Sequence, residues 1–122
     1  MNIAIMACKN INDVTCIGCQ RCMTGFHRKD GEFQRYKSDP NCRIVAIFDC
    51  GGCPATAPVI RMKQLKDWIT PMGETIDLLH IGTCVTKFCT YKETLLAMVK
   101  SKAGTEVIEG THPYAPENIF SE

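Results

Sequence analysis

Four short apolar runs divide the chain, and each is followed by a turn or by a segment with helical spacing. The first two runs span residues 2–7 and 43–49, and the last two span residues 76–81 and 106–109. The first run is uniformly apolar after Asn2, which is typical of a strand that is covered on both faces. We therefore expect four β-strands.

Helices are predicted between these strands. Apolar positions recur at helical spacing from about Cys19 to Arg28, from about Ala57 to Ile69 and from Tyr91 to Lys102. In the second of these segments, Trp68 is among the positions spaced to face the core. The alternation predicts an α/β fold, an open parallel four-stranded sheet with helices on both faces and the flavodoxin-like strand order 2-1-3-4.

Polar residues and turn formers predict the connections. Residues 9–15 are expected to form a loop, and a short helical piece is expected through Phe33 and Tyr36. Pro54 is expected in the first turn of a helix, where its missing N–H costs nothing. The strand over residues 43–49 would then run through a paired-thiol turn directly into that helix.

Length and charge limit the classes of protein to consider. The chain has 122 residues and a formal net charge of +1. This length predicts a single domain over residues 1–122. The charge gives no reason to expect a nucleic-acid or anionic-membrane partner. No apolar run approaches the ~20 residues of a membrane span, and no export signal is visible, so we expect a cytoplasmic protein.

Nine cysteines are far more than a chain of this length ordinarily carries. In a secreted protein they would suggest a disulfide scaffold. Here the count is odd, and in a reducing compartment such a set is more often metal-binding or catalytic. The sequence therefore predicts a thiol-based site.

The predicted topology brings most of these cysteines to one edge of the sheet, because ligands in open α/β sheets bind outside the carboxyl ends of the strands. A cysteine or histidine follows every predicted strand, and further cysteines lie in the first connection and after the third strand. The predicted metal ligands are Cys8, Cys16, Cys19, Cys22, Cys50, Cys53, Cys84, Cys89 and His112. Cys42 precedes the second strand, so it is expected at the opposite edge as a structural or free thiol.

Structural roles compete with these assignments. Cys8 and Cys84 could be buried apolar residues, and His112 could anchor the tail by hydrogen bonding. His80 lies within an apolar strand and is expected to be a satisfied core histidine. His27 is expected on the surface.

The donor set indicates a soft metal. Thiolates select zinc, copper(I) or iron–sulfur clusters over hard cations. One zinc ion needs only four ligands, so the excess of thiols favours a cluster, two metal sites or a site with exchangeable ligands. We expect an iron–sulfur cluster that serves electron transfer, sensing or cluster handling, with zinc as the alternative. A redox partner protein and a homodimer are compatible with such a site.

A second hypothesis is a thiol–disulfide oxidoreductase, with Cys50 as nucleophile and Cys53 as resolving thiol. A strand, a Cys-x-x-Cys turn and a helix are the arrangement that lowers a thiol pKa. A phosphatase or arsenate-reductase hypothesis fails, because it needs an arginine six residues after Cys8 and Val14 occupies that position.

Four motifs resemble those of the CGGC-domain proteins, which are small and rich in cysteine. They are Ile5-Met6-Ala7-Cys8, Asp49-Cys50-Gly51-Gly52-Cys53-Pro54, His80-Ile81-Gly82-Thr83-Cys84 and Glu109-Gly110-Thr111-His112. The resemblance spans nearly the whole chain and implies a metal-binding domain, proposed to bind zinc because of its cysteines and histidines. It brings no established reaction. By position it supports Cys8, Cys50, Cys53, Cys84 and His112 as ligands.

Overall fold

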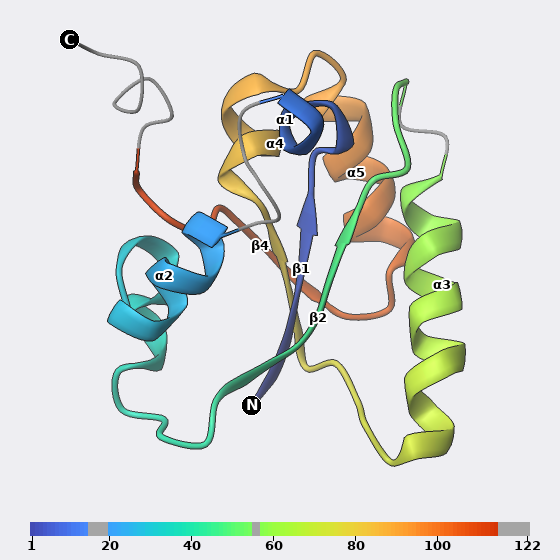
Figure 1. Ribbon diagram of the computed structural model, residues 1–122. Helices are drawn as coiled ribbons and strands as arrows, with labels where there is room; N and C mark the ends of the chain where they lie inside the picture. Colours follow the sequence, from blue (N-terminus) through green and yellow to red (C-terminus); the bar gives the residue numbers. More distant parts are fainter. Residues whose placement is uncertain (15–19, 55–56, 115–122) are drawn as a thin grey trace, which may run out of the picture.

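A computed structural model describes residues 1–14, 20–54 and 57–114. Its centre is a parallel four-stranded sheet in the order β2-β1-β3-β4 (Figure 1). The strands are β1 (Asn2–Ala7), β2 (Arg43–Asp49), β3 (Leu78–Ile81) and β4 (Glu106–Glu109). The predicted α/β fold and strand order are confirmed.

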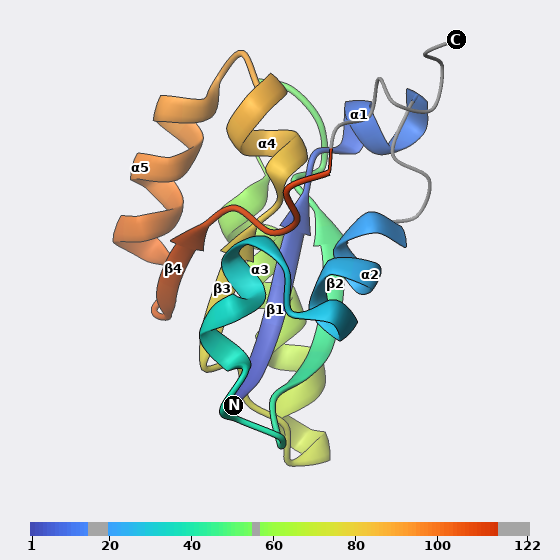
Figure 2. The same cartoon turned by 90° about the vertical axis from the view of Figure 1, so that its left-hand side faces the viewer.

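Helices cover both faces of the sheet, as predicted. α2 (Gln20–Arg28) and the 3-10 helix η2 (Gly31–Tyr36) lie on one face, and α3 (Pro58–Ile69) and α5 (Lys92–Lys102) lie on the other (Figures 1 and 2). A 3-10 turn, η3 (Thr70–Met72), ends α3. The alternation of faces follows from the strand order, since right-handed crossovers to the left and right of β1 must pass over opposite faces.

Two short helices at the C-terminal edge of the sheet were not predicted. The segment expected as a loop over residues 9–15 contains α1 (Lys9–Val14), and α4 (Thr83–Phe88) follows β3. The sulfur of Cys8 accepts hydrogen bonds from the backbone N–H groups of Asn10 and Ile11. It thus satisfies donors that a helix leaves unpaired in its first turn, in the manner of an N-cap side chain.

The core lies on both faces of β1, whose residues from Ile3 to Ala7 are all buried. The expectation for Trp68 is wrong, because this side chain is 79% exposed. Met62 and Leu65, which share the same helical spacing, do face the core as predicted, with Met62 2% exposed. Helical spacing thus predicted an apolar face of α3 that is wider than the face the helix buries.

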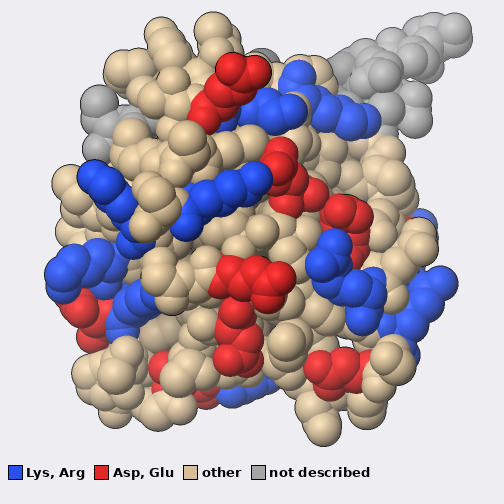
Figure 3. Space-filling model, turned by 180° about the vertical axis from the view of Figure 1, so that it is seen from behind, with Lys and Arg blue, Asp and Glu red and all other residues tan. Residues whose placement is uncertain are grey.

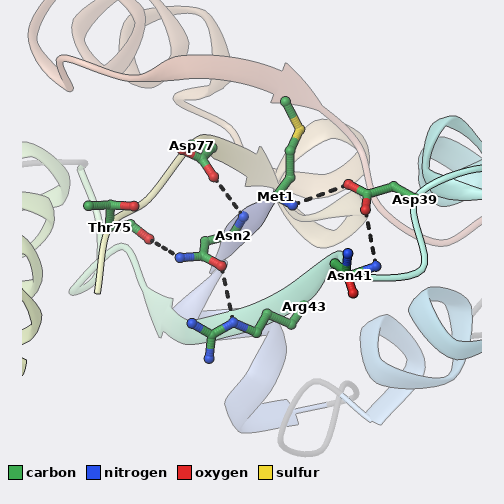
Figure 4. Close-up of polar contacts among 7 residues, drawn as sticks. All are labelled: Met1, Asn2, Asp39, Asn41, Arg43, Thr75 and Asp77. Atoms are coloured by element: carbon green, nitrogen blue, oxygen red, sulfur yellow. Dashed lines mark hydrogen bonds and ion pairs between the residues drawn. The ribbon is translucent and has the colours of Figure 1, made fainter. Parts of the chain in front are cut away.

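The N-terminal end of the sheet is held together by polar contacts (Figure 4). The Met1 ammonium donates to Asp39 Oδ2 at 3.1 Å, and the backbone N–H of Asn2 donates to Asp77 Oδ2 at 2.8 Å. Arg43 Nε donates to Asn2 Oδ1 at 3.1 Å. These contacts tie the start of β1 to the segments that enter β2 and β3.

The surface carries charges of both signs. On the face in Figure 3, lysine and arginine side chains are interspersed with aspartate and glutamate. Among the described residues, no helix has the length and apolar character needed to cross a membrane.

Candidate metal centre

Three buried thiols lie at the C-terminal ends of three adjacent strands. Cys8 follows β1, Cys50 follows β2, and Cys84 lies in the first turn of α4, just after β3. The backbone N–H of Cys8 donates to Cys84 Sγ at 3.1 Å. The backbone N–H of Cys50 donates to the carbonyl of Ala7 at 3.0 Å, so Cys50 leaves β2 level with Cys8. The structure therefore places these three predicted site residues at one edge.

The pKa of the Cys8 thiol depends on its burial and on the groups around it. Burial raises its pKa first, and negative charge on Cys50 and Cys89 would raise it further. The N–H groups of Asn10 and Ile11 act in the opposite direction. Burial and negative charge on neighbouring thiols thus oppose ionisation of Cys8, while the two N–H groups favour it.

The Cys50–Cys53 turn depends on its two glycines. Gly51 has φ +84° and Gly52 has φ +113°, a region that L side chains rarely adopt. The N–H of Gly51 donates to Asp49 Oδ1 at 2.8 Å, which closes the turn. The turn places the side chains of Cys50 and Cys53 in different environments, because Cys50 is buried and Cys53 is exposed.

The helix after this turn spans Pro58–Ile69, as the helical spacing from about Ala57 to Ile69 predicts, but the expectation for Pro54 is wrong. Pro58, rather than Pro54, occupies the first position of α3, and Pro54 lies in the turn after a cis Cys53–Pro54 bond. Cys50 is 5% exposed, whereas Cys53 is exposed and its sulfur accepts a hydrogen bond from Asn10 Nδ2 at 3.2 Å. The accessible thiol of the pair is thus Cys53, not the predicted nucleophile Cys50.

The remaining cysteines occupy separate places. Cys22 is buried on α2, and Cys89 is half-buried at the end of α4. Cys16 and Cys19 lie outside the described residues. Cys42 is buried immediately before β2, at the end of the sheet opposite Cys50, as predicted.

Within the described part of the chain, no three His, Cys, Asp or Glu side chains are grouped so that they could hold a metal ion. Cys8, Cys50 and Cys84 share the edge without forming such a group as they stand.

A buried hydroxyl pair that the sequence analysis missed joins this edge to the C-terminal segment. The backbone N–H of Thr83 donates to Thr111 Oγ1, and that of Thr111 donates to Thr83 Oγ1, both at 3.1 Å. Thr83 Oγ1 donates to the carbonyl of His112 at 2.6 Å, and Thr111 Oγ1 lies 3.1 Å from Thr83 Oγ1 and 3.3 Å from Cys22 Sγ. All of these contacts can be hydrogen bonds at the same time if the Thr111 hydroxyl donates to Thr83 Oγ1 and the Cys22 thiol donates to Thr111 Oγ1.

One sequence signal could have found this pair. A Gly-Thr dipeptide directly follows both β3 and β4, as Gly82-Thr83 and Gly110-Thr111. Adjacent parallel strands that end in the same dipeptide place the two hydroxyls at the same level of the sheet.

His80 has the structural role that was predicted. It is fully buried, and its Nδ1 donates to the carbonyl of Gly110 at 2.9 Å. The hydroxyl of Tyr36 then donates to Nε2 at 2.6 Å. Burial lowers the pKa of His80, so the ring is neutral.

His112 is buried, and its Nδ1 accepts a hydrogen bond from the N–H of Tyr114 at 3.1 Å. Its pKa is lowered to about 4, first by burial and then by the charges of Arg21 and Lys87. The neutral ring therefore carries its proton on Nε2. A metal at Nε2 would displace that proton and break the contact with Tyr114, so this geometry favours the hydrogen-bonding role over the ligand role.

Comparison with known proteins agrees with the four motifs. The family model described as the CGGC domain matches residues 2–112. An uncharacterised protein of Methanocaldococcus jannaschii is 36% identical over 87 residues, which are 69% of this chain and 62% of that protein. The chain thus spans less than two thirds of this relative. No solved structure gave a significant match. The chain belongs to the CGGC domain family, a cysteine-rich family whose membership suggests that the protein binds a metal.

Proposed function

We propose that the protein binds a soft metal centre through thiolates at the C-terminal edge of its sheet. The observation that carries this proposal is the position of Cys8, Cys50 and Cys84, buried at the ends of three adjacent strands, with the Cys8 N–H bonded to Cys84 Sγ at 3.1 Å. Packing alone does not require a sulfur at all three positions.

An iron–sulfur cluster is the centre that the donor set favours. All three residues offer sulfur, and backbone N–H groups already point at two of these sulfurs, those of Cys8 and Cys84. Hydrogen bonds to cysteine sulfur stabilise the thiolate and tune the reduction potential of such clusters. Cys53, exposed beside this edge, and Cys89 are additional thiols. The proposed role is electron transfer, sensing or cluster handling with a redox partner protein. Zinc is the alternative centre.

A thiol–disulfide oxidoreductase is the second candidate, favoured by the exposed Cys53 and its hydrogen bond from Asn10. In this reaction the Cys53 thiolate attacks a substrate disulfide and releases one substrate thiolate. The Cys50 thiolate then attacks the mixed disulfide, which releases the second thiolate and leaves a Cys50–Cys53 disulfide. The roles of the two cysteines are reversed relative to the sequence hypothesis, because Cys50 is the buried one.

The test is a visible spectrum with iron, sulfide and zinc analysis of protein purified without oxygen. We expect a brown protein with comparable amounts of iron and sulfide. Cys50→Ser and Cys84→Ser should lose most of the metal. Cys42→Ser is the matched control, because Cys42 is also buried but lies at the opposite end of the sheet.

Other results would redirect the proposal. Colourless protein with stoichiometric zinc would support the zinc alternative. Colourless, metal-free protein that exchanges disulfides through Cys53 would support the oxidoreductase. Equal metal loss from Cys42→Ser and Cys50→Ser would contradict a centre at the C-terminal edge.

A further inference from the structure

The guanidinium of Arg21 is a partly buried charge without a partner among the described residues. Arg21 lies in the first turn of α2, one residue before Cys22. Its Nη1 atom is buried and makes no hydrogen bond. A buried N–H without an acceptor is costly, more so when the group is charged, and native structures contain few. An acceptor that is absent here would remove this cost.

The surroundings of Arg21 are positive or neutral. His112 packs against α2 and α4, the two helices that carry Arg21 and Lys87. A Cβ on Gly25, one turn after Arg21 on α2, would lie 3.0 Å from His112 Cβ, and Thr83 at the start of α4 donates to the His112 carbonyl at 2.6 Å. The charges of Arg21 and Lys87 both act on the His112 ring. Among the described residues, neither cation forms an ion pair with an acidic side chain. The first turn of α2 adds the positive end of a helix dipole. Within the described part of the chain, the guanidinium therefore has no negatively charged partner.

Asp30 is an acidic side chain that the C-terminal segment contacts, and it already has a hydrogen-bond partner. Asp30 Oδ2 accepts a hydrogen bond from the Tyr114 hydroxyl at 2.5 Å. The ring of Tyr114 stacks on that of His112, with centroids 5.3 Å apart. Since Nδ1 of His112 is held by the Tyr114 N–H, the ring's second nitrogen carries the proton and is a donor.

We propose that Arg21, His112 and Lys87 form a binding site for an anionic oxygen ligand, either a carboxylate or a tetrahedral oxoanion. The guanidinium offers two parallel N–H donors that match such oxygens, the imidazole offers one N–H, and the ammonium adds charge. Parallel α/β sheets bind ligands outside the carboxyl ends of their strands, and these side chains follow β1, β3 and β4.

The inference does not depend on the proposed metal centre, because none of the three side chains is one of its proposed ligands, Cys8, Cys50 and Cys84. An alternative explanation is that the cations only balance a negatively charged thiolate centre. Anion binding by metal-free protein distinguishes the two explanations, because no charged centre is then present to be balanced.

The experiment uses the reduced, metal-free full chain. Inorganic phosphate and malonate are each titrated against chloride at constant ionic strength. The readouts are the NMR signals of the Arg21 and His112 side chains and the unfolding temperature. We expect saturable shifts and a higher unfolding temperature with at least one of the two anions. Phosphate binding would identify an oxoanion site, and malonate binding a carboxylate site.

Arg21→Gln should weaken anion binding at least about tenfold, as expected when a charged hydrogen bond is lost. Lys87→Gln should weaken binding less and is a safer variant for folding, because Lys87 is exposed. Arg35→Gln is the control, since Arg35 is an exposed arginine of η2 that pairs with Glu32. An absence of saturable binding in the parent protein, or equal binding by the parent and Arg21→Gln, would overturn the site. Metal analysis of Arg21→Gln keeps the proposals distinct, because the anion site predicts retained metal.

Discussion

At the scale of single residues, Thr111 shows how one hydroxyl joins three parts of the chain. It accepts from the backbone of Thr83 at the start of α4 and contacts the Cys22 thiol of α2. Thr83 directly precedes the proposed ligand Cys84, and Cys22 is itself a predicted ligand. Thr111 thus links the two segments that carry these thiols.

The substitution Thr111→Val keeps the shape of this side chain and removes its hydroxyl. The buried N–H of Thr83 then loses its acceptor, and we expect the free energy of unfolding to fall by about 1–3 kcal/mol. Urea denaturation of metal-free, reduced protein measures this change. Thr90→Val, at an exposed position after α4, should change the free energy by less than about 0.5 kcal/mol. Equal effects of the two substitutions would mean that the buried pair does not stabilise the fold.

The residues that sequence reasoning placed correctly are those with one dominant property. His80 was expected in the core because it interrupts an apolar run, and it is fully buried with both ring nitrogens bonded. Thr111 has no such dominant property, and only the Gly-Thr dipeptide repeated after β3 and β4 indicates its role. Trp68 was misplaced because its helical spacing is compatible with either edge of the apolar face.

At the scale of elements, the long segments were predictable and the two shortest helices were not. α1 and α4 have six residues each, too few to be stable alone or to show a period. They form where the strands end, with the Cys8 sulfur accepting from the first turn of α1 and the Gly82 carbonyl accepting from α4. Tertiary contacts rather than local propensity determine them.

Two glycines in left-handed turns provide a matched test of close packing between elements. Gly31 starts η2 with φ +58°, and Gly73 follows η3 with φ +80°. A Cβ on Gly31 would collide with the carbonyl oxygen of Thr111, whereas a Cβ on Gly73 would meet nothing. Both Gly→Ala substitutions incur backbone strain of about 1 kcal/mol.

Gly31→Ala should therefore destabilise the protein by about 2 kcal/mol more than Gly73→Ala, in the range of overpacked sites. Thermal or urea unfolding of both variants measures the difference. If both variants lost the same stability, the close approach of η2 to the C-terminal segment would have no energetic weight.

At the scale of the whole molecule, two buried histidines predict the pH dependence of stability. Burial is the first cause that lowers the pKa of both His80 and His112, the latter to about 4. In the unfolded chain a histidine titrates near 6.5. Below that pH the unfolded state binds protons that the folded state does not, so acid favours unfolding.

The free energy of unfolding should therefore have its full value above about pH 6.5. It should fall as the pH drops towards 4, by about 1–3 kcal/mol for His112. Urea denaturation of metal-free protein at several pH values measures this fall. His112→Gln should make it shallower. His27→Gln, at an exposed position of α2, should leave it unchanged. A stability that stayed flat across this range would contradict neutral, buried rings.

The topology itself was predictable because strand and helix alternate and crossovers have one hand. The predicted topology also places Cys8, Cys50 and Cys84 at one edge of the sheet, from the sequence alone. The orientation of the thiols was not predictable, as Cys50 and Cys53 illustrate. They differ in exposure because of turn geometry at Gly51 and Gly52, which a pattern of residue types does not encode.

The polar contacts of Asn2, Arg43 and Asp77 lie at the end of the sheet opposite Cys8, Cys50 and Cys84. These stabilising contacts and the proposed metal centre thus lie at opposite ends of the same strands. A protein engineer could strengthen the first end to offset losses caused by exchanging cysteines at the second. The fold therefore offers a scaffold on which different metal sites can be tried without redesigning what holds the sheet together.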